Sequence, residues 1–331
     1  MYSMLMRLLS ICGLLLAVVV LNFLLLQLAP GDPVSVIVGE QGGASEELVA
    51  QLRAQYGLDK PVYQQLLLYI SRIATGDFGY SYYFNQPVLD LILQRVVPTM
   101  LLVLSALIIA VVLGTVLGVF SARRPKGVTS HLVTVFSLVG YAAPVFWTGL
   151  MLLILFASVW PIFPVSGMMD VGRRGSTMDH VVDVLHHLVL PGLTLASIYI
   201  AIYSRLSRAS MLEVLGSDYI RTARAKGLSD RQVVFGHALR NGLIPIATMV
   251  GLQFGQLFAG AVLVETVFNW PGLGRLAFES VLRRDYPTLL AILFFSALLV
   301  VMANLLTDLA YGIIDPRIRK KRGARGGKAA Q

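Results

Sequence analysis

The sequence predicts an all-α membrane protein with six transmembrane helices. Hydrophobic residues make up 56% of the 331 residues and charged residues only 14%, whereas a soluble domain carries about 25% charged residues. Six stretches of at least 21 residues contain no Asp, Glu, Lys or Arg: 8–31, 96–122, 127–169, 184–204, 241–264 and 286–307. Roughly 20 apolar residues of α-helix cross a bilayer core of about 30 Å. This excludes a soluble enzyme, a disordered chain and a collagen-like fibre.

The charge-free runs set the expected spans. The first run has 24 residues, too long for the apolar core of a secretory signal, so it is read as a retained span. Trp160-Pro161 should end the third span near residue 158, and Leu190-Pro191-Gly192 should start the fourth, with proline in the first helical turn. We expect one transmembrane domain over 1–319 and a basic tail over 320–331. The expected spans are 8–29, 97–121, 132–158, 188–208, 241–264 and 287–311.

The loop between the first two spans, 30–96, should be partly helical. Apolar residues recur at helical spacing over 46–56, and Gly57 is a plausible stop. A second amphipathic helix is expected from Val62 to Ile73, ending before Thr75-Gly76. The loop is therefore predicted to be folded.

The basic residues indicate how the chain crosses the membrane. Six spans put both termini on one side, and the loops of that side hold 18 of the 27 Lys and Arg residues. Because positively charged loops stay in the cytoplasm, both termini should be cytoplasmic. The tail at 320–331 would then touch anionic membrane lipid. It has no aromatic residues between its charges for stacking on bases, so nucleic acid is not an expected partner.

Three metal-ligating residue types lie together between the third and fourth spans. His180, Asp183 and His187 would share one face of a helix and could bind a divalent metal. The neighbouring sequence offers no second pair of strong ligands, so surface histidines are the favoured interpretation. We therefore predict neither a metal site nor a cofactor in this chain.

The loop 205–240, between the fourth and fifth spans, has more local structure than a connection requires. Asp218 can cap a short helix, and Gly227 can end that helix in the left-handed conformation. Ser229 and Gln232 have the spacing of a capping box, which would start another helix. Exposed basic residues are expected at Arg221, Arg224, Lys226 and Arg231. A rigid, protruding element of this kind suits docking to another protein.

The same loop resembles part of a known family. The segment 218–241 is similar to the coupling loop of ATP-binding-cassette (ABC) import permeases, and most similar to the first of the two permease subunits of dipeptide, oligopeptide and nickel importers. Of the general importer motif, only Ala223, Gly227 and Leu239 match outright. Further family motifs extend over residues 1–319: Leu28-Ala29-Pro30-Gly31-Asp32-Pro33, Gly57-Leu58-Asp59-Lys60-Pro61, Gly76-Asp77-Phe78-Gly79, Ala143-Pro144-Val145-Phe146-Trp147, Trp270-Pro271-Gly272-Leu273-Gly274 and Asp315-Pro316-Arg317.

This resemblance implies a fold and a set of partners. The fold would be that of a type I ABC importer permease with cytoplasmic coupling helices, in the bacterial inner membrane. The partners would be a related second permease subunit, two cytoplasmic ATP-binding subunits and an extracytoplasmic solute-binding protein. ATP and Mg²⁺ would be bound by the ATP-binding subunits, since this chain has no Gly-x-x-x-x-Gly-Lys-Ser/Thr loop. The residues expected to couple to those subunits are Asp218, Arg221, Ala223, Arg224, Ala225, Gly227 and Leu228.

A few residues within the spans could line a transport pathway. Polar side chains rarely face lipid without an internal partner, and the candidates are Pro144, Gln253, Gln256 and Asn304. Contacts between closely packed helices are the alternative for Gln253 and Gln256, because glycines lie near them.

Two other functions are weighed against the importer. A secondary transporter of a small solute is the main alternative, although no carboxylate lies in the middle of a predicted span to couple protons. A membrane-embedded enzyme is the other, but His-Glu-x-x-His, Gly-x-Ser-x-Gly and paired intramembrane aspartates are missing. The resemblance thus predicts a subunit without catalytic residues that forms half of the translocation pathway of an ATP-driven importer. Its substrates would be di- or oligopeptides or related small solutes.

Overall fold

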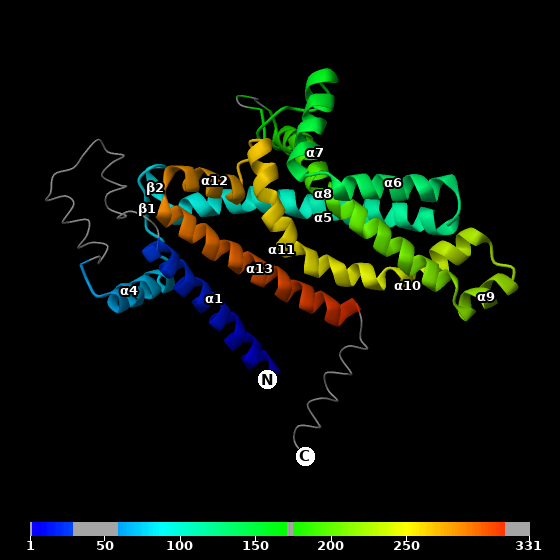
Figure 1. The fold of residues 1–331 in the computed structure, drawn as a ribbon, viewed down its shortest axis with the longest axis horizontal. Helices are drawn as coiled ribbons and strands as arrows, with labels where there is room; N and C mark the ends of the chain where they lie inside the picture. The colour runs from blue at the N-terminus through cyan, green and yellow to red at the C-terminus, as the bar shows by residue number, and fades with distance from the viewer. Residues whose placement is uncertain (1, 29–58, 171, 173–174, 315–331) are drawn as a thin grey trace, which may run out of the picture. The chain divides into compact units, whose positions relative to one another are not determined.

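The chain is almost entirely helical, as the sequence predicts (Figure 1). The computed structural model describes residues 2–28, 59–170, 172 and 175–314. Two compact units can be distinguished: unit 1 comprises 1–98 and 271–301, and unit 2 comprises 99–270 and 302–331. Two long helices run through both units, α5 (Val88–Arg123) and α13 (Tyr286–Ile314).

Unit 1 contains the N-terminal helix and part of the loop that follows it. Besides its parts of α5 and α13, its elements are α1 (Tyr2–Leu28), α4 (Val62–Ala74), the antiparallel strands β1 (Tyr80–Ser81) and β2 (Gln86–Pro87), and α12 (Leu273–Arg283). Helix α4 confirms the amphipathic helix predicted from Val62, and Thr75 follows its last residue as expected. The helix predicted over 46–56 lies outside the described residues.

A polar contact and an aromatic contact connect the helices of unit 1. Asn22 on α1 donates from Nδ2 to the backbone oxygen of Leu290 on α13 (3.1 Å), which satisfies a polar group that lipid cannot satisfy. The rings of Phe23 on α1 and Tyr69 on α4 have centroids 6.1 Å apart. The presence of Asn22 in the apolar part of α1 is thus explained by helix packing.

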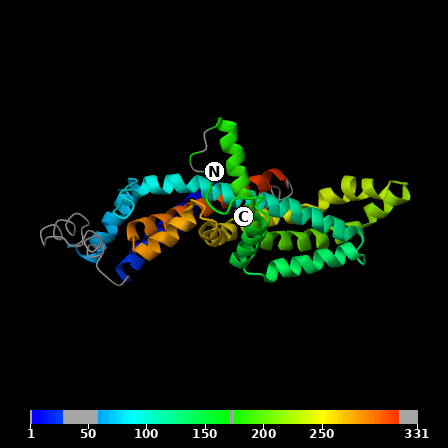
Figure 2. The same ribbon diagram turned by 90° about the horizontal axis from the view of Figure 1, so that it is seen from above.

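Helix α8 is the centre of unit 2, where it packs against α6, α7, α10 and α11. Figures 1 and 2 show α6 running alongside it. Leu195, Ala196 and Tyr203 on α8 are completely buried. Besides its parts of α5 and α13, the elements of unit 2 are α6 (Val128–Ala142), α7 (Val145–Leu153), the π-helical segment η1 (Ile154–Val159), α8 (Thr177–Leu215), α9 (Asp218–Ala225), the π-helical segment η2 (Gln232–Ala238), α10 (Leu239–Gly242) and α11 (Ile244–Val267).

Two of the predicted spans differ from the structure at a proline. The predicted third span, 132–158, is not one straight helix: it bends by 108° between α6 and α7, with Pro144 at the N-cap of α7. The helix start expected at Leu190–Gly192 is wrong, because α8 begins at Thr177 and Pro191 lies in its interior. Ser176 starts α8 instead, in a capping box with Asp179.

Several of these helices are suited to a membrane. Four helical stretches among the described residues are long and apolar enough to cross it, or five if the bent pair α6–α7 counts as one span. Within α1, the apolar part is shorter and covers Leu9–Leu25. The exact count of six spans therefore stays a prediction.

Candidate functional site

The predicted docking element is present as α9, which lies at one end of unit 2 (Figures 1 and 2). Ser217 occupies the N-cap position in an extended conformation, and its hydroxyl donates to the Val214 carbonyl on α8 (2.6 Å). Asp218 was predicted to be the cap, but it is the first helical residue. A carboxylate there still favours the helix through the macrodipole. Arg221 approaches it with Nη1 3.3 Å from Oδ1.

A hydrophobic cluster anchors α9 to the rest of unit 2. Ile220 (0% exposed) and Ala223 (7%) are the two buried residues of α9. They pack in one cluster that holds Val119 and Ala122 of α5, Met211 of α8, and Val233, Val234 and Ala238 of η2. Burial of apolar side chains stabilises by about 1.5–3 kcal/mol for a residue the size of isoleucine. Helix α9 is therefore fastened along one face to the ends of two long helices.

The turn after α9 has the predicted conformation. Gly227 has φ +78°, in the left-handed region that favours glycine. Ser229 and Gln232 form the expected capping box: Gln232 N donates to Ser229 Oγ (3.4 Å), and Ser229 N donates to Gln232 Oε1 (3.0 Å). The helix, glycine corner and helix predicted from sequence are confirmed.

The second helix of this element continues into the membrane part through a π-helical segment. Residues 230–242 are helical, with η2 (Gln232–Ala238) wound as a π-helix and α10 following it. A π segment within a longer helix often marks a functional position. The sequence carries no signal for it, because the hydrogen bonds of a π-helix span only one residue more than those of an α-helix.

Two polar contacts brace this region. Arg123, the last residue of α5, has Nη2 2.7 Å from Oδ2 of Asp230. Asn241 on α10 donates from Nδ2 to the Tyr219 hydroxyl on α9 (2.8 Å). Sequence reasoning missed both, because partners 107 and 22 residues apart are brought together only by the fold. The contacts connect α9 and the start of η2 to helices that extend toward the membrane part.

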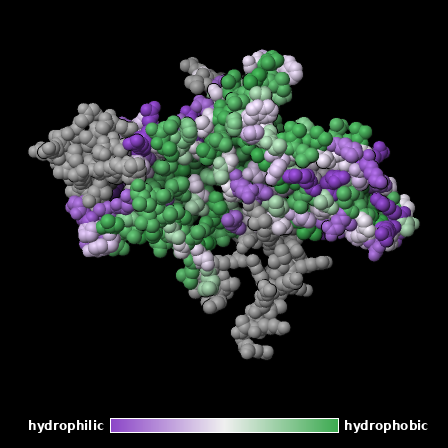
Figure 3. All heavy atoms as spheres, in the orientation of Figure 1, coloured by the Kyte–Doolittle hydropathy of each residue, from purple (hydrophilic) through white to green (hydrophobic). Residues whose placement is uncertain are grey.

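The seven predicted coupling residues do not all face outward. Five are exposed: Asp218, Arg221, Arg224, Ala225 and Gly227. Leu228 is partly buried against the hydrophobic cluster, and Ala223 lies within it. A larger side chain at Ala223 would therefore first disturb packing inside this chain. Figure 3 shows hydrophilic residues gathered at the end of unit 2 where α9 lies.

The four candidate pathway residues occupy different environments. Gln253 is buried (6% exposed), and its Oε1 has no hydrogen-bond partner in the part of the chain that the structure describes. Gln256, expected on the same face, is exposed, as are Pro144 and Asn304. Glycine 251 of the same helix faces Thr307 of α13, close enough that a Cβ at position 251 would collide with it. This favours helix packing for the buried side of α11.

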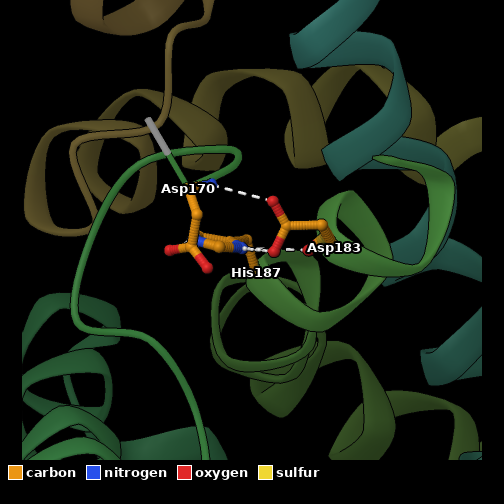
Figure 4. A group of neighbouring side chains, drawn as sticks. All are labelled: Asp170, Asp183 and His187. Atoms are coloured by element: carbon orange, nitrogen blue, oxygen red, sulfur yellow. Dashed lines mark hydrogen bonds and ion pairs between the residues drawn. The ribbon is translucent and has the colours of Figure 1, made fainter. Parts of the chain in front are cut away.

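A second polar cluster in unit 2 was only partly foreseen. Asp183 (1% exposed) and His187 (5%) are buried on α8 next to Asp170 (Figure 4), so the interpretation of His187 as a surface histidine is wrong. His180 is exposed as expected. The cause is tertiary: the loop before α8 folds back over this turn of the helix, which helical spacing alone cannot show.

Comparison with known families identifies related proteins over nearly the whole chain. Residues 114–320 match the family described as binding-protein-dependent transport system inner membrane component. Residues 1–105 match the N-terminal family of the same systems' membrane components.

The relatives carry names of peptide transport systems. The chain is 40% identical over 325 residues to the dipeptide transport system permease protein DppB of Escherichia coli K12, covering 93% of this chain and 95% of that protein. It is 41% identical over 323 residues to the di/tripeptide permease protein DppB of Pseudomonas aeruginosa, with coverages of 92% and 95%. It is 39% identical over 305 residues to the oligopeptide permease protein AppB of Bacillus subtilis, again covering 92% and 95%.

A solved structure supports the fold. The chain resembles a chain of the MetNI methionine ABC transporter in an inward-facing conformation, with a TM-score of 0.50 and 14% sequence identity. The likeness covers 66% of this chain and 92% of the other. It shows a fold of the type I importer permease kind.

Proposed function

Because this chain belongs to the family of inner-membrane components of binding-protein-dependent transport systems, we propose that it is the permease subunit of an ATP-driven importer of di- or oligopeptides or related small solutes. It would form half of the translocation pathway together with a related second permease. It is a multi-pass inner-membrane protein and not itself an enzyme. The observation that carries the proposal is about 40% identity to peptide permeases over more than nine-tenths of the chain.

The role of α9 is to receive force from an ATP-binding subunit. An element that transmits a movement must keep its shape. Helix α9 has a buried face that anchors it, and it is followed by a glycine turn and by a helix with a capping box. Its outward face carries Arg221 and Arg224, which can pair with carboxylates on a partner. Closure of two ATP-binding subunits around ATP and Mg²⁺ would move this element in both permeases. The nucleotide would be bound by the partners, and this chain would need no cofactor for transport.

The remaining assignments follow from the same proposal. Both termini and α9 would be cytoplasmic, as the distribution of basic residues favours. A solute-binding protein would deliver substrate on the opposite side. Gln256 and Asn304 are exposed polar residues on helices of the membrane part and are suited to line the pathway. Pro144 would contribute by bending the α6–α7 pair.

Reversing one charge on α9 tests the proposal. In the assembled transporter, Arg224→Glu should weaken binding of the ATP-binding subunits about tenfold or more, since a like-charge contact costs at least 1.4 kcal/mol. Uptake of a labelled dipeptide into vesicles should fall with it. The matched control is Lys126→Glu, an exposed charge between α5 and α6, which should leave both measurements near wild type. Equal effects of the two substitutions, or none from Arg224→Glu, would contradict a docking role for α9.

A further inference from the structure

The last residue of α5 is bonded to the first turn of the helix that follows the glycine corner. Nε and Nη2 of Arg123 both donate to Oδ2 of Asp230, across 3.2 and 2.7 Å. Two donors from one planar guanidinium fix the direction of the contact as well as its length. Asp230 is the first helical residue after Ser229, where a carboxylate is stabilised by the positive end of the helix dipole. The ion pair therefore joins two helix ends in a defined orientation.

This ion pair adds orientation more than stability. The side chains of Arg123 and Asp230 are 33% and 58% exposed, and an ion pair at that exposure contributes little to the free energy of unfolding. The hydrophobic cluster already joins α5 to η2, since Val119 of α5 and Val233 of η2 are both buried in it. Apolar contacts have no preferred direction. The cluster therefore holds the two helices together, and the ion pair sets how one is turned against the other.

The other end of α5 within unit 2 is bonded to the same succession of helices. Thr99 Oγ1 donates to Oε1 of Glu265 on α11 (2.6 Å), and both residues are buried. Asp230 lies at the start and Glu265 near the end of the helices η2, α10 and α11, which follow one another from residue 230 to 267. Helix α5 is thus bonded to these helices at two points, and the contact with Asp230 is the one next to α9.

Helix α9 is fixed to the helix that carries Asp230. Asn241 of α10 donates from Nδ2 to the Tyr219 hydroxyl of α9 (2.8 Å). Ile220 of α9 is completely buried, in one cluster with residues of η2. A displacement of α9 would therefore carry Asp230 with it. Because Arg123 is bonded to Asp230, the same displacement would reach α5 at its last residue.

We propose that Arg123 and Asp230 are positioning residues for the coupling of ATP hydrolysis to transport. Their ion pair passes the movement that α9 receives on to α5, in addition to α8 and η2, which precede and follow α9 along the chain. Helix α5 then turns together with η2 and does not slip past it. The inference rests on the proposed function, because it requires that an ATP-binding subunit docks on α9. Neither residue contacts nucleotide or solute, and each acts through the orientation of α5.

Neutral variants of the pair test the proposal in the assembled transporter, reconstituted in vesicles. Arg123→Gln, Asp230→Asn and the double variant are compared for the ATP hydrolysed per molecule of dipeptide taken up. Each single substitution should raise this ratio at least about twofold, the smallest change typical of a residue in a coupling network. The double variant should be no worse than either single variant, because both substitutions remove the same interaction. The matched control is Arg124→Gln, an exposed arginine next in the sequence, which should leave the ratio at the wild-type value.

Two further measurements separate positioning from a structural or docking role. The unfolding temperature should change little in all the variants, and the affinity of the ATP-binding subunits for the permease should stay at the wild-type value. A wild-type ratio in the single variants, effects that add in the double variant, or a loss of affinity that accounts for the change in ratio overturns the proposal. Failure of the proposed function would give a different result, since wild type itself would then take up no dipeptide at the expense of ATP.

Discussion

Two glycines on α5 determine how closely it approaches α8. A Cβ on Gly118 would lie 2.5 Å from the Ser207 Cβ, and one on Gly114 would lie 2.6 Å from the Tyr203 Cβ. The Ser207 hydroxyl also donates to the Thr115 carbonyl (3.2 Å). Small residues permit such close packing between membrane helices. The contact therefore depends on the absence of a single methyl group at each position.

Replacing Gly118 with alanine should destabilise the chain. The added methyl group would collide with α8, and overpacking of this kind costs about 1–3 kcal/mol. The matched control is Gly13→Ala on α1, where a Cβ has no atom within 4 Å and helix propensity favours alanine by about 1 kcal/mol. Thermal unfolding in detergent should give a lower temperature for Gly118→Ala and an unchanged or higher one for Gly13→Ala. A neutral Gly118→Ala would mean that the helices lie farther apart.

Some single-residue properties could be predicted from the sequence and others could not. The left-handed conformation of Gly227 and the Ser229–Gln232 pair depend on neighbours within three residues, so local rules predicted them. The burial of His187 depends on a loop folding back from a distance, and the inward face of Ala223 depends on contacts with α5 and α8. Local chemistry is readable from sequence, whereas burial requires the fold.

The capping box after the glycine corner is the element-scale feature that stiffens the docking region. It fixes where the helix through η2 begins, beside the Arg123–Asp230 ion pair. The chain has a second capping box of the same kind, formed by Ser176 and Asp179 at the start of α8. The two capping boxes can therefore be compared, because each should stabilise its helix by a similar free energy and only their locations differ.

Removing each cap should separate stability from coupling. Ser229→Ala and Ser176→Ala should each cost about 1 kcal/mol, visible as similar drops in unfolding temperature. Ser229→Ala should also raise the ATP hydrolysed per molecule of solute taken up by the assembled transporter. A helix that frays at its start would transmit less of the movement of the ATP-binding subunits. Ser176→Ala should leave that ratio unchanged. If both substitutions change the ratio alike, the effect comes from general stability.

Helices were easier to predict than their ends. Long apolar runs predicted α5 and α13, and amphipathic spacing predicted α4. The sequence suggested a helix start at Pro191, but tertiary packing accommodates this proline inside α8. At Pro144, by contrast, the helix is interrupted and the chain bends between α6 and α7. The sequence around each proline does not distinguish these outcomes, because the energy that decides comes from neighbouring helices.

At the scale of the whole molecule, the proposed importer and a secondary transporter differ in energy source. Vesicles containing the complete transporter should keep taking up solute when an ionophore collapses the proton gradient while internal ATP stays high. Depletion of ATP should stop uptake, because the proposed importer draws its energy from the ATP-binding subunits. A proton-coupled transporter in the same vesicles is the control for the ionophore. Uptake that stops with the gradient alone would favour the secondary transporter.

The π-helical segment η2 has a consequence for how this chain tolerates change in length. Each α-helical residue advances the winding by about 100°, so losing one residue within Gln232–Ala238 would rotate every side chain beyond it about the helix axis. Gln253 would then turn away from its buried position, and Gly251 would no longer face Thr307. The wider winding of η2 thus determines which face of α11 packs against the neighbouring helices, while the position of α9 is unchanged.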